Sequence, residues 1–489
     1  MRVDTAEGTG SRHPSTTNWH LPAVPFRRLV GPSATVAVVA SLWWTPPPDG
    51  VTLQAWRLFA IFGATIFSVV AGVLPILTAS VLAISAAVLT RLLSPAEAYA
   101  GFSNGTILLI VVAFLVASAV IKCGLGTRAG HWIVSRFGKS TLGLSYSLFA
   151  LDAVIAPAFP SNTARSGVLY PLALSVAEGA GAKPDQPGRR RLGAFLMYSG
   201  TTSVSLSSAL WLTAMAGNPL GAAIARSAGV EIDFGRWLLA ASVPTLCAIV
   251  VQPLMLYWLI GPEVRHTPEA PAAARQALAA LGPLKRQEWI VLVVFVAMVI
   301  LWGAAATLGL DSTAIAFLGL GLLLATRVIT LGDIGKQGDV LATFLWFAVL
   351  FTLSDQLNQL GFMAFLGERL ANALGDFATA TAGFILVIAY ILLHYLFVSP
   401  TAHLLALFGV FLDVGVKLGV NPTLLAFQLL FATNYFSLIT PQGSSSNLLF
   451  ASSGYFTPGE LYRLGGITTA VSFLVYAVVG TAWLMFAVR

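Results

Sequence analysis

Long apolar segments interrupted by small polar residues are the feature that most constrains what this chain can fold into. Two such interruptions lie in each half of the sequence, near 160–167 and 213–219 and again near 398–403 and 440–447. Backbone groups without hydrogen-bond partners cost several kcal/mol each in hydrocarbon, so irregular backbone survives there only around a cavity or a bound solute. Paired interruptions at corresponding positions of two halves indicate the central binding site of a secondary transporter.

The composition agrees with a chain that lies in a lipid bilayer. Hydrophobic residues make up 57% of the 489 residues and charged residues 10%, whereas soluble domains carry about 25% charged residues. The net charge is 27 − 20 = +7, and the positive residues lie mostly between apolar segments. This distribution is typical of basic cytoplasmic loops and excludes a nucleic-acid-binding face on a soluble module. Cys123 and Cys247 lack metal-binding or redox spacing, so we expect small buried residues there.

Transmembrane helices require about 20 apolar residues. Segments of this kind lie near 29–45, 56–73, 75–93, 103–122, 192–214, 236–260, 288–309, 312–328, 341–358, 378–393, 423–440 and 464–488. Two stretches, near 142–177 and 385–412, are apolar on both sides of a Ser/Pro/Thr cluster, which favours a helical hairpin that re-enters the membrane. The alternative for each is a pair of ordinary spans joined by a short loop. The sequence therefore predicts an all-α polytopic membrane protein with two re-entrant hairpins, two broken helices and about 11 spans.

The loop charges predict how the chain is oriented. Basic clusters lie in the tail 1–28 (Arg12, Arg27, Arg28), at Arg189 to Arg191, at Arg265 to Arg286, around Arg327 and Lys336, and at Arg463. Placing them all in the cytoplasm makes the first hairpin open inward and the second outward, which is an inverted repeat.

The predicted organisation is a cytoplasmic tail (1–28), a first half (29–262), a cytoplasmic linker (263–287) and a second half (288–489) in the inner membrane. The linker has Pro-rich and Ala/Arg-rich stretches, compatible with an interfacial amphipathic helix. The tail lacks the apolar core and cleavage site of a secretory signal, and a transit peptide is the alternative for it.

The first hairpin tip carries Ser161, Asn162 and Thr163, two hydroxyls and an amide. The N-terminus of the returning half-helix has free N–H groups and a partial positive charge, which attracts carboxylates. Alternatively, carbonyls of the first half-helix could bind Na⁺ together with Ser161 and the Asn162 oxygen, because hard cations prefer oxygen ligands. A polar tip without any ligand is the third alternative.

The other three interruptions repeat this chemistry, with glycine and proline breaking the helix and hydroxyls or amides beside them. Their candidate substrate-binding residues are Gly217, Asn218 and Pro219, Ser399 and Thr401, and Thr440, Gly443, Ser445 and Asn447. Together the four segments are rich in hydrogen-bond donors and poor in carboxylates. They therefore favour an anionic substrate over a cationic one.

Charged residues inside apolar segments are functional candidates by default. Arg165 pairs either a substrate carboxylate or an internal acid such as Asp152. His403 either contacts substrate or is a packing histidine with its hydrogen bonds satisfied. Asp355 and Asp413 are expected near the ends of spans rather than in a coupling role.

The order of hairpin and broken helix, with Ser161-Asn162-Thr163 at the first tip, resembles the divalent anion:sodium symporter family from about Trp44 to the C-terminus. Segments 191–194, 212–216 and 394–395 are similar to the branch of 2-oxoglutarate/malate translocators and bacterial citrate/succinate or tartrate/succinate exchangers. Sodium-coupled members carry Ser-Asn-Thr in both hairpins, where it binds Na⁺ and a substrate carboxylate. This chain has Pro400 at the second amide position, which puts a second sodium site in doubt. The resemblance also implies a homodimer in which the substrate-holding part slides against a scaffold.

These observations predict a secondary transporter of di- or tricarboxylates of the 2-oxoglutarate, malate, succinate or citrate class. We expect anion exchange with elevator-type alternating access, and no cofactor other than possible Na⁺. The alternative is a sodium-coupled symporter of the same acids or of an inorganic anion such as sulfate. An intramembrane enzyme is not supported, because the sequence has neither a GxGD nor an HExxH motif.

Overall fold

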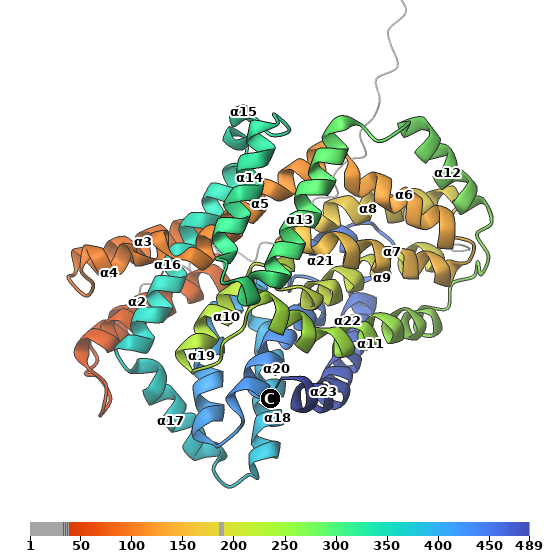
Figure 1. The fold of residues 1–489 in the computed structure, drawn as a ribbon. Helices are drawn as coiled ribbons and strands as arrows, with labels where there is room; N and C mark the ends of the chain where they lie inside the picture. Colours follow the sequence, from red (N-terminus) through yellow and green to blue (C-terminus); the bar gives the residue numbers. More distant parts are fainter. Residues whose placement is uncertain (1–32, 34, 36, 38, 185–189, 489) are drawn as a thin grey trace, which may run out of the picture.

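The computed structural model describes residues 33–488 except 34, 36, 38 and 185–189, and every regular element in this part is a helix (Figure 1). Ten helices in the described residues are long and apolar enough to cross a membrane. The predicted all-α polytopic membrane fold is therefore confirmed. The predicted tail 1–28 and the start of the 29–45 segment lie outside the described residues.

The two halves contain matching series of elements, except that α11 of the first half corresponds to α22 and α23 of the second, which are joined by a π-helical turn (Tyr476–Gly480). The first half contains α2 (Leu53–Val70), α3 (Ile76–Leu89), α4 (Pro95–Tyr99), α5 (Gly105–Cys123), α6 (Leu125–Phe137), α7 (Thr141–Ile155), α8 (Asn162–Gly179), α9 (Arg190–Leu210), α10 (Gly217–Ser227) and α11 (Phe234–Ile260). The second half contains α13 (Arg286–Leu308), α14 (Ser312–Ala325), α15 (Leu331–Gly335), α16 (Gly338–Gln359), α17 (Phe362–Leu374), α18 (Thr379–Leu393), α19 (Pro400–Lys417), α20 (Pro422–Tyr435), α21 (Ser445–Ala451), α22 (Pro458–Val475) and α23 (Thr481–Ala487). The linker helix α12 (Glu269–Leu281) lies between them.

The repeat extends to backbone geometry after α3 and α14. Arg91 (φ 60) and Arg327 (φ 58) are the non-glycine residues with positive φ among the described residues, and a threonine precedes each. A Ser94–Glu97 capping box then begins α4, and a Thr330–Asp333 capping box begins α15. A left-handed arginine is energetically unfavourable, so its presence at the same step of both halves indicates a shared local structure.

Each hairpin has the predicted form of two helical arms around an irregular tip. The first consists of α7, a 3-10 turn (Ala156–Ala158), the tip and α8, and the second of α18, a 3-10 turn (His394–Leu396), the tip and α19. The apolar segment 378–393 is thus the first arm of the second hairpin and not a separate span. Besides the one-turn helices α4 and α15, two longer helices were not predicted, α6 and α17. Each has only 13 residues with polar and charged side chains among the apolar ones, too short to be recognised as a span.

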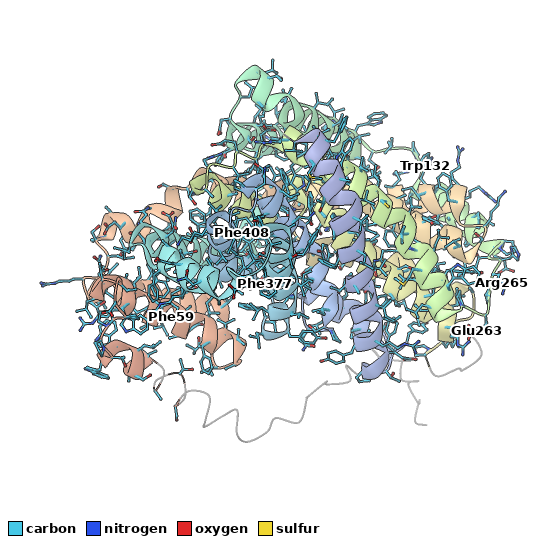
Figure 2. All side chains as sticks on the ribbon, turned by 90° about the horizontal axis from the view of Figure 1, so that it is seen from below. Phe59, Trp132, Glu263, Arg265, Phe377 and Phe408 are labelled. Atoms are coloured by element: carbon cyan, nitrogen blue, oxygen red, sulfur yellow. The ribbon has the colours of Figure 1, made fainter. Side chains whose placement is uncertain are left out.

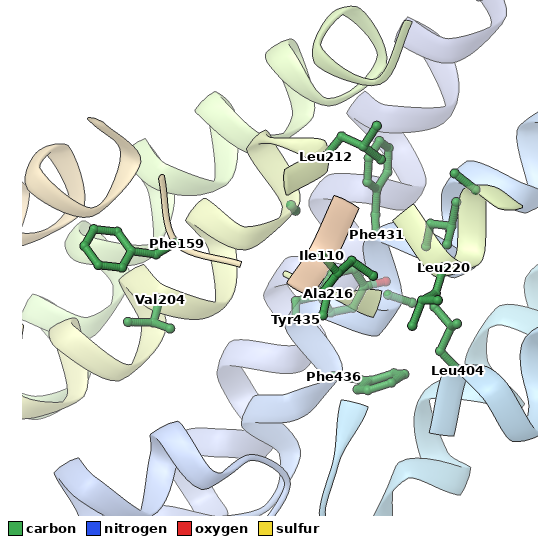
Figure 3. Packing of buried hydrophobic residues seen from close by; sticks show 14 of the residues in the cluster. Ile110, Phe159, Val204, Leu212, Ala216, Leu220, Leu404, Phe431, Tyr435 and Phe436 are labelled. Atoms are coloured by element: carbon green, nitrogen blue, oxygen red, sulfur yellow. The ribbon is translucent and has the colours of Figure 1, made fainter. Parts of the chain in front are cut away.

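The helices pack as two groups. A scaffold group contains α2, α3, α5, α13, α14 and α16, and a core group contains the hairpins, the broken helices, α11, α22 and α23. Figure 1 shows α2, α3 and α16 at one side of the molecule and α11 and α22 at the other. In the core group, aromatic side chains of α20 and the turn after it lie near Leu220 of α10 and Leu404 of α19 (Figure 3). This apolar packing holds the broken helices beside the hairpins.

The linker is fixed to the first hairpin by backbone hydrogen bonds. Thr141 donates its backbone N–H to the Arg265 carbonyl (3.1 Å), and Thr267 donates to the Lys139 carbonyl (3.0 Å). The helix α12 then packs along α6. In Figure 2, Glu263, Arg265 and Trp132 lie at the same edge of the molecule.

Candidate functional site

The first hairpin tip has the backbone of a helix start. Ser161 is extended (φ −126, ψ 116) and its hydroxyl accepts the Ala164 N–H at 3.2 Å, which caps α8. The serine preference at this position follows from the free N–H groups at a helix start, which a hydroxyl oxygen can accept. Thr163, two residues on, is exposed. The tip therefore presents the N-terminus of α8 and the exposed hydroxyl of Thr163.

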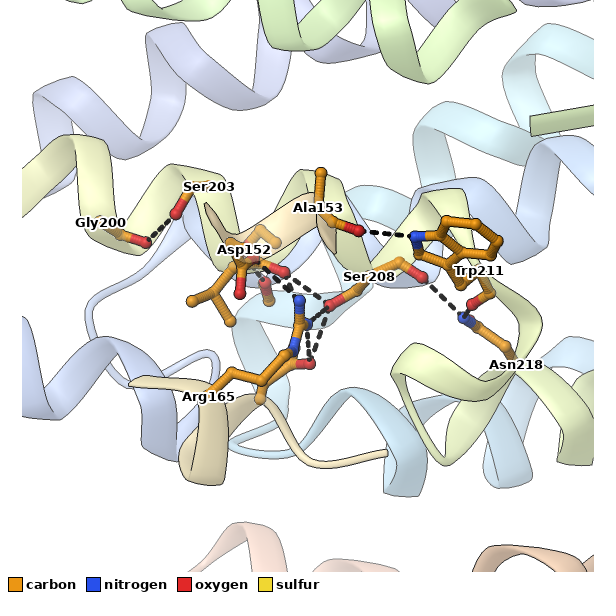
Figure 4. A network of polar contacts seen from close by, with 12 residues as sticks. Asp152, Ala153, Arg165, Gly200, Ser203, Ser208, Trp211 and Asn218 are labelled. Atoms are coloured by element: carbon orange, nitrogen blue, oxygen red, sulfur yellow. Dashed lines mark hydrogen bonds and ion pairs between the residues drawn. The ribbon is translucent and has the colours of Figure 1, made fainter. Parts of the chain in front are cut away.

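Behind this tip lies a buried cation, Arg165, whose guanidinium has no solvent exposure (Figure 4). Its Nη1 donates to Asp152 Oδ2 at 2.8 Å, and Asp152 is equally buried. Its Nη2 donates to Asn162 Oδ1 (2.8 Å), to the Val204 carbonyl (2.9 Å) and to the Ser208 hydroxyl. Of the two partners considered for Arg165, the structure selects the internal acid. A charge this deeply buried requires such a partner.

The same arrangement occupies the Asn162 amide oxygen. Oδ1 of Asn162 accepts from Arg165 and, at 2.8 Å, from the Ser208 hydroxyl. This oxygen is the side-chain ligand that the sequence offered for Na⁺ at the first tip. A guanidinium now lies in hydrogen-bonding contact with it. A cation placed there would meet a fixed positive charge.

In each of the two broken helices, an asparagine side chain donates hydrogen bonds to backbone carbonyls at the break. The Asn218 amide donates to the carbonyls of Ser208 (2.8 Å) and Trp211 (3.2 Å). The Asn447 amide donates to the carbonyls of Ser437 (2.6 Å) and Thr440 (3.3 Å), at the same two spacings along the chain. These carbonyls lie where the first half of each helix ends, and those of Trp211 and Thr440 also accept the backbone N–H groups of Ala214 and Gly443. The amide nitrogens of Asn218 and Asn447 therefore stabilise the breaks, while the Asn447 amide oxygen is buried without a hydrogen-bond partner.

The two halves meet at these breaks. Asn434 of α20 donates to Asn218 Oδ1 at 3.0 Å, and the hydroxyls of Ser205 and Ser437 are 3.0 Å apart. Both pairs join the first broken helix to the second. Because all four side chains are fully buried, this polar contact replaces water that cannot reach the backbone at membrane depth.

Each hairpin tip also lies against the break of the other half. The Thr163 hydroxyl is 2.6 Å from the Ser445 hydroxyl at the start of α21, and both residues are exposed. On the other side, a methyl group built on Gly217 would lie 3.5 Å from Thr401 Oγ1. Thr401 and Gly217 are buried. The structure thus brings the candidate residues together as two cross-half pairs, with Pro219 buried inside α10.

The second tip differs from the first in its chemistry. Ser399 caps α19 by accepting the Ala402 N–H at 3.3 Å, as Ser161 does for α8. The next residue is Pro400, which has no amide. The Gly443 carbonyl accepts from His394 Nε2 at 2.9 Å, and any side chain on Gly443 would collide with the Ser437 carbonyl at 2.5 Å. Glycine is required there so that the break can approach the hairpin.

Asp355 and Asp413 lie toward the end of α19 that is farther from the second tip. Asp413 pairs with Lys417 at 3.0 Å, and Asp355 accepts from Gln359 at 2.8 Å.

His403 lies in the first turn of α19, beside the second tip, and packs among the rings of Tyr390, Phe397 and Phe436. Its Nδ1 lies 3.3 Å from Nδ1 of His394, and its Nε2 is buried without a hydrogen-bond partner. His403 is therefore packed as one of its two expected roles has it, but its hydrogen bonds are not all satisfied.

Several site residues were missed by the sequence analysis. Ser208, Asn434 and Ser437 connect tips and breaks, yet they lie within segments that we interpreted as simple spans. A signal for α9 was present, because hydroxyl residues are dense between 199 and 208 in an otherwise apolar helix. Ser208, Asn434 and Ser437 are all fully buried and form a row of polar side chains inside the core group.

Comparison with known proteins identifies the family. A family model described as the sodium:sulfate symporter transmembrane region matches residues 27–488. YflS of Bacillus subtilis (strain 168), named provisionally as a malate transporter, is 39% identical over 458 residues, covering 93% of this chain and 96% of the relative. Dicarboxylate transporter 2, chloroplastic, of Spinacia oleracea is 37% identical over 443 residues, covering 90% of this chain and 78% of the relative.

Solved structures share the fold at low sequence identity. The YdaH transporter of Alcanivorax borkumensis has a TM-score of 0.56 at 15% identity, covering 81% of this chain and 89% of that one. MtrF of Neisseria gonorrhoeae has a TM-score of 0.56 at 13% identity, covering 92% and 98%. Because the family model spans nearly the whole chain, this protein belongs to the sodium:sulfate symporter family, the divalent anion:sodium symporters that its sequence resembles.

Proposed function

We propose that this protein exchanges di- or tricarboxylates across a membrane without sodium. One observation carries the proposal: Arg165 donates to the Asn162 amide oxygen that a sodium site at this tip requires. The names of the relatives support the substrate class, since one is named for malate and another for dicarboxylates. With a fixed guanidinium at the first tip and proline at the second, exchange of one anion for another keeps the charge balanced.

In this proposal the substrate carboxylates lie at the cross-half pairs. The starts of α8 and α21 meet at Thr163 and Ser445, and the starts of α19 and α10 meet at Thr401 and Gly217. Free N–H groups at helix starts favour anions, and the hydroxyls fix their position. A dicarboxylate with one carboxylate at each pair contacts both halves at once. Ser161 and Ser399 contribute to the substrate site indirectly, because they cap the starts of α8 and α19. Thr440 contributes through its backbone carbonyl at the second break.

The same proposal covers how the protein moves during transport, its oligomeric state and its orientation in the membrane. The core group moves as one body against the scaffold group in an elevator-type cycle, within a homodimer in the inner membrane. The N-terminus lies in the cytoplasm. The relatives are named as transporters, which supports a carrier rather than an enzyme.

Counterflow in proteoliposomes tests the exchange. Vesicles loaded with unlabelled malate, in choline buffer free of sodium, are expected to accumulate labelled dicarboxylate, because the internal anion supplies the return charge. Empty vesicles are expected to accumulate none. Uptake into empty vesicles that rises steeply with external Na⁺ would contradict exchange.

That second outcome would support the other candidate function, sodium-coupled uptake of the same acids or of sulfate. The observation that favours it is the family description, which names sodium and sulfate. Adding sulfate as a competitor to the counterflow assay separates the two substrate classes, because only a sulfate carrier loses dicarboxylate uptake at equimolar sulfate.

Cysteine labelling tests the proposed orientation. In a background with Cys123 and Cys247 replaced by serine, we expect a membrane-impermeant thiol reagent on intact cells to label Lys417→Cys but not Arg191→Cys. The reason is the cytoplasmic bias of basic loops. The Arg191 side chain is 65% exposed and the Lys417 side chain 31% exposed, so the reagent can react at either position when it is on the same side of the membrane. Labelling at 191 without labelling at 417 inverts the assignment.

A further inference from the structure

Two histidines at the second hairpin form a buried pair that the proposed exchange does not use. His394 ends the first arm and His403 lies in the first turns of α19, and neither has solvent exposure. Their Nδ1 atoms are 3.3 Å apart, and His394 Nε2 lies 2.9 Å from the Gly443 carbonyl oxygen. The pair therefore connects the hairpin tip to the second break.

The hydrogen bonds fix which nitrogen is free. A carbonyl oxygen only accepts, so Nε2 of His394 carries the hydrogen and Nδ1 of a neutral His394 is bare. That bare nitrogen accepts from Nδ1–H of His403. Nε2 of neutral His403 then has no hydrogen, and it is buried without a hydrogen-bond partner. One unpartnered basic nitrogen is thus held inside the core group.

The surroundings of His403 suit a cation. Ring centroids of Tyr390, Phe397 and Phe436 lie 4.4, 4.8 and 4.6 Å from the imidazole centroid. Aromatic faces attract a cation within about 6 Å, and they also accept a weak N–H contact. The three rings therefore provide the favourable contacts that an imidazolium at this position needs.

No carboxylate in the described residues balances such a charge. The titratable groups that face His403 are His394 and Tyr390, whose hydroxyl is 3.0 Å from that of Thr433. The helices packed against α19 carry Asp339 at the start of α16, and their other charged residues lie toward the far end of α19: Asp355 of α16, Arg226 of α10, Glu368 and Arg369 of α17, and Asp413 and Lys417 of α19 itself. A proton on His403 would leave the cluster with one uncompensated positive charge.

In the first half, the position that corresponds to His403 is occupied by Arg165. Arg165 is the fourth residue after the cap serine of α8, and His403 is the fourth after the cap serine of α19. Asp152 neutralises Arg165, whereas the ring of Tyr390 contacts His403. The first half therefore holds a permanent, neutralised cation. The second half holds a titratable group without an acid.

We propose that Nε2 of His403 binds one proton from solvent when the substrate anion occupies the second tip. One N–H bond forms at Nε2 and one O–H bond of a hydronium ion breaks, releasing a water molecule, and the charge of the histidine pair changes from 0 to +1. The substrate supplies the negative charge that the protein lacks there. By linkage, the anion increases the proton affinity and the proton increases the anion affinity by the same factor. This inference rests on the proposed exchange function.

The test is counterflow at equal internal and external pH, from 6 to 8, with malate or 2-oxoglutarate, whose carboxyls titrate well below pH 6. We expect the half-saturation concentration to fall as the pH falls, by up to about tenfold per unit for one coupled proton. His403→Asn retains an amide donor toward His394 but cannot titrate. It is expected to lose the slope and to match the wild type at pH 8. The matched control, His131→Asn on α6, is expected to keep the slope.

A second measurement needs no variant. Substrate added to purified wild-type protein in weakly buffered solution with a pH indicator is expected to cause uptake of up to about one proton per chain. No uptake, a flat pH profile in the wild type, or a slope that persists in His403→Asn each overturns the proton site. Counterflow that is absent at every pH instead overturns the proposed exchange, so the two failures are distinguishable.

Discussion

Replacing Asp152 by alanine is expected to destabilise the folded protein by about 3–5 kcal/mol, because Arg165 would remain charged and fully buried without its carboxylate. The free energy of unfolding, from a denaturant titration in detergent, measures the loss. A double variant, Asp152→Leu with Arg165→Met, removes both charges and is expected to recover most of the stability. It is not expected to recover transport, because Asn162 has then lost one of the two donors that hold its amide oxygen.

The chain offers a matched control in the exposed pair of Arg226 and Glu231, 3.0 Å apart with side chains 64% and 68% exposed. Removing one partner of such a surface pair changes stability by less than about 1 kcal/mol. If Asp152→Ala costs no more than Glu231→Ala, the buried ion pair does not have the role that its geometry assigns.

Asn162→Ala is expected to abolish exchange while the protein stays folded in the membrane. The substitution removes the acceptor shared by Arg165 and Ser208 and so releases the start of α8. A hydrogen bond to a charged group contributes about 1.5–3 kcal/mol, which corresponds to roughly a tenfold to hundredfold loss if the geometry of the tip limits the rate. The measurement is initial counterflow rate per folded molecule, with the folded fraction from size-exclusion chromatography.

Ser118→Ala serves as the control for this prediction. Ser118 donates only to the Leu115 carbonyl within α5 of the scaffold group, so its loss should leave the rate unchanged. An Asn162→Ala rate above half that of the wild type would reject a site at the first tip.

The sequence could predict the hairpins and breaks because their physics is local. Small polar residues inside an apolar run have few explanations in a membrane, and Ser161 and Ser399 each cap the helix that follows. The order of elements follows from those positions, and the inverted repeat follows once the basic loops are placed on one side of the membrane. Prediction failed for α6 and α17, since a short helix of mixed polarity resembles a loop.

The partners of the site residues could not be predicted for a different reason. Arg165 meets Asp152 only because the hairpin folds back on itself, and Asn434 meets Asn218 across 216 residues of sequence. Whether a buried amide faces a substrate or a backbone carbonyl depends on those pairings. The sequence therefore identified Asn218 and Asn447 as important without indicating that they close the breaks.

The cross-half contacts have a consequence for when the site can form. Thr163 meets Ser445 and Thr401 lies beside Gly217, so each tip is completed by the break of the other half. Neither half alone therefore contains a complete tip. During synthesis, both tips stay incomplete until the chain beyond the α12 linker has been inserted and has packed against the first half.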